Sequence, residues 1–267
     1  MLAAYEAVLR GRCSPGWADT SMTYLRRWRD FCNGRDLRAM RSADAEGFLA
    51  KQRGAVTPAT ANRIRAVLQA FCGWACTGPN PFANVRHFGE PPPTEIVHCT
   101  RAERSAILTA ADGDAEALAV WLGFYSGMRR GEIHRAKWSD VGRDTVIVPV
   151  SKTGRRRVLP LAAELRDRLE PMRPRHDGRI VPWPEPFSAW PAASQRLLDR
   201  LRLKCETVPA THVRWNAWRH TFGSLLAQEG VSIDKIASWL GNSPQVCKRH
   251  YAEFTPRDRH DDQIDRL

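Results

Sequence analysis

The segment that most constrains the fold of this 267-residue chain is CTGPNPFANVRHFGEPPPTEIVH, at residues 76–98. Prolines and glycines cluster in it, and neither a helical nor a strand period continues through it. Three consecutive prolines at 91–93 favour an extended backbone. We therefore predict a linker at residues 87–97, which divides the chain into a small helical domain at 1–86 and a larger domain at 98–267.

The net charge indicates the class of partner. The chain carries a formal charge of +12, most of it from arginine. Such a surplus attracts phosphate polyanions, and the guanidinium fork binds phosphate oxygens, so nucleic acid is a better partner than a membrane surface. The hydrophobic share of 43% is sufficient for packed cores, and no apolar run reaches membrane-spanning length. We expect a soluble, intracellular protein with no membrane partner.

The cysteines argue against a disulfide framework and against a metal site. There are seven of them, an odd number, and no two form a CxxC pair. Cys72 and Cys76 lie four residues apart on a predicted helix, where apolar packing is their ordinary role, and no second Cys or His pair exists to complete a zinc site. We predict reduced thiols, no metal and no cofactor.

Apolar residues at helical spacing predict helices through most of both domains. In the small domain, one helix carries Ile64 and Phe71 on its apolar stripe, while Arg63 and Arg65 are expected on its other face. For these two arginines, DNA contact and ordinary solvation are equally good interpretations. In the large domain, DTVIVPV and RRVLPL flank SKTGR, which is a strong hairpin signal. The sequence predicts a mainly α fold with a small antiparallel β-hairpin.

Four short pieces of the large domain carry polar residues that are suited to phosphate chemistry. The residues are Arg129 and Glu132 in SGMRRGEI, Lys152 in SKTGR, Asn216 and Arg219 in NAWRH, and Asn242 and Tyr251 in LGNSPQVCKRHY. Taken singly, each has an ordinary structural role. Arg129 could pair with Glu132 one helical turn away, and Tyr251 could be a half-buried packing residue at a helix end.

Taken in order, these pieces resemble the tyrosine recombinase family, also called the phage integrase family. Its catalytic domain shows a G-x-R-x-x-E element, a hairpin lysine, an H-x-x-R-H element, an L-G-H segment and a terminal tyrosine. The matching pieces are GMRRGE, SKTGRRRVLPL, WRHTFGS, LGNSPQ and HYAEF, and they span roughly residues 98–255. TPATANRIRA in the first domain also looks like the helical core-binding domain of that family, with much less specificity.

The resemblance implies a two-domain architecture and a mechanism without metal or ATP. Tyr251 would attack a DNA phosphodiester, form a 3′-phosphotyrosyl bond and release a 5′-hydroxyl. Arg129 and Arg219 would hold the non-bridging oxygens, and Lys152 would protonate the leaving oxygen. Glu132 would orient Arg129.

The sequence departs from the family pattern at two positions. Asn216 stands where a histidine is usual, and Asn242 stands where a histidine or tryptophan is usual. Asparagine can donate a hydrogen bond to phosphate, but it cannot accept and hold a proton near neutral pH. His220 is expected to be a structural neighbour of Arg219, while His250 and His212 are close enough in sequence to substitute in part.

Three functions remain open on the sequence alone. The first is an active site-specific recombinase, the second a relic that binds DNA without cleaving it, and the third a type IB topoisomerase-like swivelase. The resemblance implies double-stranded DNA as partner, gripped by the two domains as a C-shaped clamp, a homotetramer on paired sites, an accessory DNA-bending protein and a cytoplasmic, nucleoid-associated location. Arg155, Arg156 and Arg157, beside the hairpin, are expected to hold phosphates without reading sequence.

Overall fold

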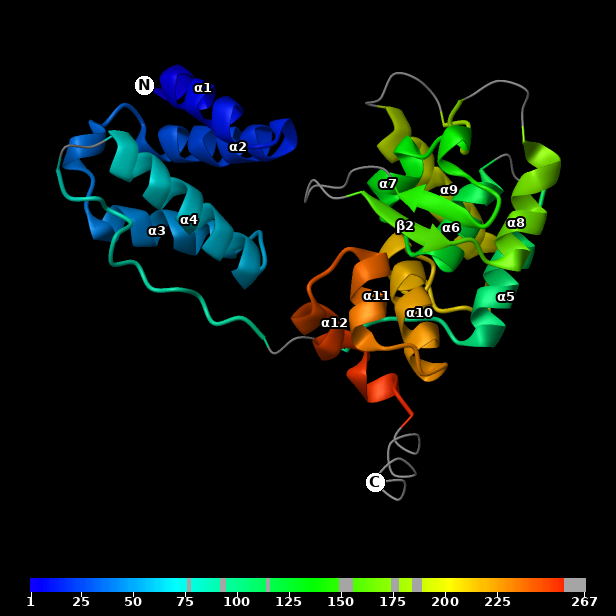
Figure 1. The fold of residues 1–267 in the computed structure, drawn as a ribbon. Helices are drawn as coiled ribbons and strands as arrows, with labels where there is room; N and C mark the ends of the chain where they lie inside the picture. Colours follow the sequence, from blue (N-terminus) through cyan, green and yellow to red (C-terminus); the bar gives the residue numbers. More distant parts are fainter. Residues whose placement is uncertain are drawn as a thin grey trace. The chain divides into compact units, whose positions relative to one another are not determined.

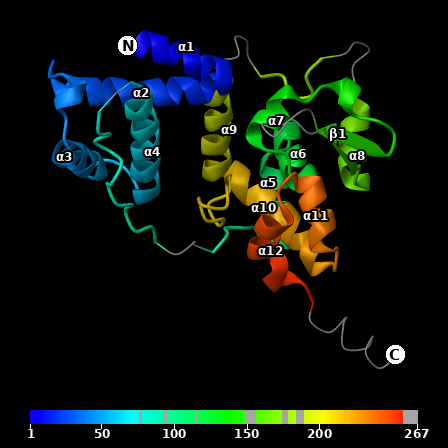
Figure 2. The ribbon, with the colours of Figure 1, turned by 60° about the vertical axis from the view of Figure 1, so that its left-hand side comes forward.

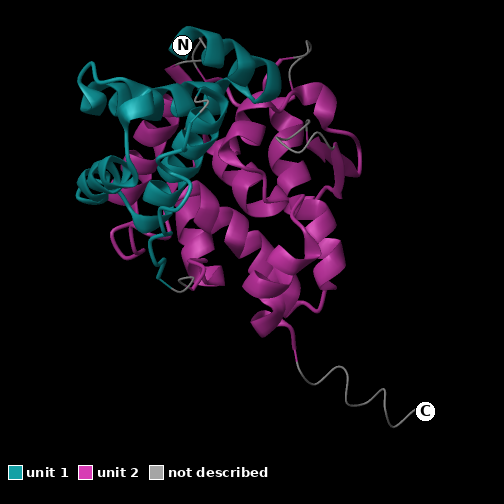
Figure 3. Cartoon of the chain, turned by 90° about the vertical axis from the view of Figure 1, so that its left-hand side faces the viewer, with its two compact units in different colours: residues 1–94 teal, residues 95–267 magenta. Residues whose placement is uncertain are grey.

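A computed structural model describes residues 1–75, 78–91, 95–113, 116–148, 156–173, 178–183 and 189–256. The chain forms two compact units, Met1–Thr94 and Glu95–Leu267 (Figure 3). The boundary between the units falls inside the proline-rich segment. Within the described ranges, no helix combines the length and the apolar character that a membrane span requires.

The first unit is a helical bundle. Its elements are α1 (Leu2–Arg12), α2 (Pro15–Cys32), the 3-10 turn η1 (Leu37–Ala39), α3 (Ser42–Arg53) and α4 (Pro58–Ala75) (Figure 1). Proline at the first position of α2 and of α4 suits a helix start, because the missing N–H has no helical partner there. The Trp28 ring packs against Phe48 and Phe82, with centroids 5.2 and 5.0 Å away, and joins α2 to α3 and to the chain after α4.

The chain after α4 is bound to the polar side of that helix. Asn62 donates to Phe88 O at 3.0 Å and accepts from Phe88 N at 2.8 Å. Arg65 donates to Val85 O and lies 2.5 Å from His87 Nε2. The expectation that Arg65 lies on an exposed face is therefore wrong, because residues 85–88 cover it. Arg63 is exposed, with its guanidinium 5.9 Å from the centre of the Trp17 ring.

The second unit is built around α6, which is buried over most of its length. Its helices are α5 (Arg101–Ala110), α6 (Ala117–Ser126), α7 (Arg130–Arg135), α8 (Ala163–Leu169), α9 (Trp190–Lys204), α10 (Trp215–Gln228), α11 (Ile233–Leu240) and α12 (Pro244–Tyr251). Its 3-10 turns are η2 (Trp138–Asp140), η3 (Glu170–Met172) and η5 (Ala252–Phe254). Helix α10 packs along α6 and contacts α11 and α12, so that α10, α11 and α12 lie side by side (Figure 2).

The expected hairpin is present as two antiparallel strands, β1 (Thr145–Val148) and β2 (Arg157–Pro160). The register pairs Thr145 with Pro160 and Val148 with Arg157. Val146, Val148 and Leu159 face the core, as expected from the side-chain alternation of strands. The prediction of a mostly helical fold with a small antiparallel sheet is thus confirmed. Lys152 and Arg155 lie outside the described residues.

We predict that Asn62→Ala lowers the free energy of unfolding by about 1–3 kcal/mol, because the Phe88 backbone loses both hydrogen bonds to the Asn62 side chain. Hydrogen exchange at the Phe88 amide should accelerate with it. The exposed Asn84, changed to alanine, is the matched control. Equal exchange rates at Phe88 in the two variants would contradict this account of the segment.

Candidate active site

Arg219 is a buried cation held at the ends of two helices. It projects from α10 and is 5% exposed. Its guanidinium donates to Gly127 O and to Leu240 O, each at 2.5 Å. These carbonyls lie at the carboxyl ends of α6 and α11, where the helix dipoles favour positive charge. Burial, followed by the nearby charge of Arg129, lowers the pKa of Arg219 to about 10, so it stays protonated at neutral pH.

Gly127 makes the turn that brings Arg129 to this site. The glycine ends α6 with φ +58°, and a Cβ there would come within 2.7 Å of Leu240 and Phe222. Arg129 then serves as the N-cap of α7, and its backbone N–H donates to Glu132 Oε2 at 2.8 Å. Its side chain is 41% exposed, so Arg129 is accessible where Arg219 is not.

Asn242 joins the two arginines. Its Oδ1 accepts from Arg129 Nη2 at 2.7 Å and from Arg219 Nη2 at 3.1 Å. In this arrangement the amide oxygen faces cations, so Asn242 acts as an acceptor that gathers two guanidinium groups.

Glu132 carries the compensating negative charge. The carboxylate is 2% exposed and accepts from Arg129 Nη1 at 3.2 Å and from Arg157 Nη2 at 2.9 Å. Burial alone would raise the pKa of Glu132, but the hydrogen bonds from Arg157 and from the Arg129 N–H outweigh it and lower the pKa. Arg157 is buried and donates to this carboxylate, so the expectation that it holds DNA phosphates is wrong in this structure. Arg156, next to it, is exposed.

Tyr251, the last residue of α12, is fully buried. Its ring lies against Gly223 of α10, where an added Cβ would come within 2.5 Å of the ring. Its hydroxyl lies 3.0 Å from Nδ1 of His220. Burial raises the pKa of Tyr251 to about 12, and the charges of Arg219 and Arg129 oppose this rise only in part. The phenol is therefore protonated and covered.

His220 is the residue whose role sequence reasoning missed. We expected a structural neighbour of Arg219, yet the ring contacts the hydroxyl of Tyr251. Burial, together with His250 and Arg219, lowers the pKa of His220 to about 4, so the ring is neutral and we assign Nδ1 as the acceptor of the phenol proton. Helix α12 decides this contact, and the sequence around His220 carries no signal of it.

The other sequence-predicted residues are distributed differently. Asn216 is exposed, one turn before Arg219, and the hydrogen bonds that join Arg129, Arg219 and Asn242 do not include it.

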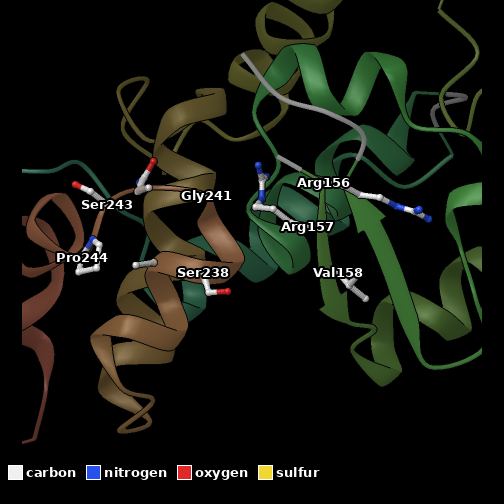
Figure 4. A pocket seen from close by; sticks show the side chains of 9 residues that line it. Arg156, Arg157, Val158, Ser238, Gly241, Ser243 and Pro244 are labelled. Atoms are coloured by element: carbon white, nitrogen blue, oxygen red, sulfur yellow. The ribbon is translucent and has the colours of Figure 1, made fainter. Parts of the chain in front are cut away.

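A cavity of about 570 Å³ opens beside Asn242, between the start of β2, the end of α11 and the start of α12 (Figure 4). Its lining residues are Arg156, Arg157, Val158, Ala237, Ser238, Gly241, Asn242, Ser243 and Pro244. In the described ranges, no three Cys, His, Asp or Glu side chains gather as metal ligands do.

The sequence model of the phage integrase family matches residues 99–256, more than half of the chain. The chain belongs to the phage integrase family. This confirms the resemblance drawn from the five motifs. No curated protein sequence matches the chain.

Solved integrase structures share the fold of this phage integrase family member. A lambda integrase dimer bound to a COC′ core site matches with a TM-score of 0.73 and 20% identity, over 97% of this chain and 95% of that one. A Tn1549 transposon integrase in complex with transposon right end DNA gives 0.71 and 17%, over 100% and 98%. A lambda integrase tetramer bound to a Holliday junction gives 0.74 and 18%, over 97% and 78%. Identities this low show the fold alone.

We predict that Gly223→Ala lowers the free energy of unfolding by about 1–3 kcal/mol and displaces Tyr251, because the ring occupies the space of the new methyl group. Nitration of Tyr251 by tetranitromethane, followed by mass spectrometry, should then be faster. Gly47→Ala is the control, since this glycine of α3 has open space around its Cβ position. Unchanged nitration and stability in Gly223→Ala would contradict the packing described.

The low pKa of His220 makes stability depend on pH. Its pKa of about 4 lies below the ordinary 6.5, so the unfolded chain binds this proton first as the pH falls. Stability contributed by neutral His220 should be complete above about pH 6.5 and should decline toward pH 4. In His220→Gln, the slope of unfolding free energy against pH should be smaller across this window, as measured by urea denaturation. An identical slope in both proteins would show that His220 does not carry the effect.

Proposed function

We propose that this protein is a site-specific DNA recombinase that cleaves and rejoins DNA through a 3′-phosphotyrosyl intermediate on Tyr251, without metal or ATP. One observation carries the proposal. Arg129 and Arg219 lie 113 and 23 residues from Asn242 along the chain, yet both donate to its single amide oxygen. Two guanidinium groups that converge in this way form a receptor for the non-bridging oxygens of one phosphodiester.

The chemistry follows from the groups around this receptor. The phenol of Tyr251 would release its proton to water, and Oη would attack phosphorus while the bond from phosphorus to O5′ breaks. The departing oxygen would take a proton from Lys152. The charge that develops on the non-bridging oxygens would be held by Arg129 and Arg219. Loss of one such donor typically costs about a hundred- to a thousand-fold in rate.

Tyr251 must leave its buried position before it can react. Its side chain is 0% exposed, and its hydroxyl is engaged with His220. A histidine with a pKa of about 4 is a weak base, so we assign His220 to holding the resting tyrosine rather than to removing its proton. DNA binding would then be coupled to a shift of α12, the helix that carries the tyrosine.

Double-stranded DNA is the proposed partner, and paired sites would be bound by four protomers. The similar lambda integrase structures include a dimer on a core site and a tetramer on a Holliday junction, which supports this assembly. Arg156 beside the cavity and Arg63 on α4 are exposed and are proposed as phosphate contacts. Phosphate contacts of this kind give an affinity that falls with salt.

A second candidate is a protein that binds DNA without cleaving it. The observation in its favour is the burial of Tyr251, which removes the nucleophile from solvent. A third, topoisomerase-like activity would relax supercoiled DNA as a monomer. Covalent trapping separates the first two candidates, and the number of protomers that assemble on paired sites separates a recombinase from a swivelase.

We predict that the protein forms a covalent adduct with nicked duplexes drawn from the DNA that flanks its gene and from a randomised pool. The nick lets the released strand diffuse away, so the adduct should accumulate on a denaturing gel. Tyr251→Phe should abolish it, whereas Tyr125→Phe should not. Mass spectrometry of the adduct should place the DNA on Tyr251, and an adduct that survives in Tyr251→Phe would refute the assignment.

A further inference from the structure

Arg157 and Arg156 are neighbours in sequence with different environments. Arg157 is the first residue of β2 and pairs with Val148, the last residue of β1. Its side chain is 6% exposed, while Arg156 is exposed. The two side chains leave the backbone in different directions (Figure 4). Only Arg156 is available to a macromolecular partner.

The Arg157 guanidinium connects three elements. Nη1 and Nη2 donate to the two oxygens of Glu132 at 3.2 and 2.9 Å, and Nε donates to Trp239 O at 3.0 Å. Gly241 lies directly on it, since a Cβ at that position would come within 2.6 Å of Nη1. One side chain of β2 therefore fixes both the first turn of α7 and the end of α11.

The first turn of α7 and the end of α11, which Arg157 contacts, also hold the accessible side chain of Arg129. Glu132 accepts from the backbone N–H and from Nη1 of Arg129. Asn242, the residue after Gly241, accepts from Nη2 of Arg129 and from Arg219. The Arg129 guanidinium is thus held by Glu132 and by Asn242. Glu132 is hydrogen-bonded to Arg157, and Asn242 follows Gly241, which lies against Arg157.

We propose that Arg157 is a positioning residue of the catalytic site, which sets the place of the Arg129 guanidinium through Glu132 and through the Gly241–Asn242 turn. The catalytic part of this statement rests on the proposed function. The planar fork of arginine is needed, because a lysine ammonium cannot bind both carboxylate oxygens and the Trp239 carbonyl together. Arg157 itself does not contact the DNA.

The first test needs no DNA. Phenylglyoxal modifies free guanidinium groups, and its rate at Arg129 can be followed by mass spectrometry in the full-length protein. We expect Arg129 to react several-fold faster in Arg157→Lys and in Arg157→Gln than in the unchanged protein. The matched control is Arg166→Gln, which removes a 40%-exposed arginine from its 3.0 Å pair with Asp144 near the same hairpin. An unchanged rate at Arg129 in a folded Arg157 variant would overturn the proposal.

The second test uses the duplex recovered from covalent trapping. We expect adduct formation by Arg157→Lys to be about a hundredfold slower at saturating DNA, with DNA affinity preserved. A methylphosphonate at the cleaved position lacks the charge that Arg129 would stabilise, so the same comparison on that substrate should shrink to less than about tenfold. An equal loss on both substrates would overturn the proposal, because a general loss of structure does not depend on that charge.

The two proposals fail in different ways. If the unchanged protein forms no adduct with any duplex, the proposed recombinase activity fails, while the phenylglyoxal rates still decide whether Arg157 positions Arg129. If the unchanged protein forms the adduct and Arg157→Lys forms it equally fast, the recombinase stands and the role of Arg157 is refuted. Circular dichroism of each variant shows which proteins are folded.

Discussion

The buried carboxylate of Glu132 is the constraint on which the site depends. A charge at 2% exposure is costly unless it is paired, and Glu132 is paired with both Arg129 and Arg157. Those pairs tie the first turn of α7 to the start of β2. The carbonyl of Trp239 and the close contact at Gly241 extend the same network to the end of α11. The buried carboxylate of Glu132 and its partners therefore determine how α7, β2 and α11 are arranged.

Positive charge is concentrated here at the carboxyl ends of helices. Arg219 lies where α6 and α11 end, and Asn242 joins it to Arg129 through a neutral oxygen. A carboxylate at position 242 would cancel one of the two positive charges, whereas an amide oxygen accepts from both guanidinium groups and leaves their charge intact. At this position, where the resemblance implies a histidine or a tryptophan, the amide of Asn242 thus brings the two cations together.

Tyr251, the proposed nucleophile, is covered by the same helices. The phenol lies against Gly223, bonds to a neutral histidine and has a pKa of about 12 because it is buried. A protonated phenol out of contact with solvent is a poor nucleophile. The structure therefore separates the two arginines that are proposed to bind the phosphate, of which Arg129 is accessible, from the group proposed to attack it.

The sequence by itself determined the family, the mainly helical fold and the hairpin, because motif order, helical periodicity and a strong turn are local properties of the chain. The sequence motifs also identified Arg129, Glu132 and Arg219 as candidate site residues. Only the tertiary structure decided what each arginine does. Arg65 and Arg157 lie within two residues of the exposed Arg63 and Arg156, yet packing against residues 85–88 and against Glu132 buries them. The tertiary structure likewise decided the contact of His220 with Tyr251. Which side chains meet across helices depends on long-range packing, and neither spacing nor residue type encodes it.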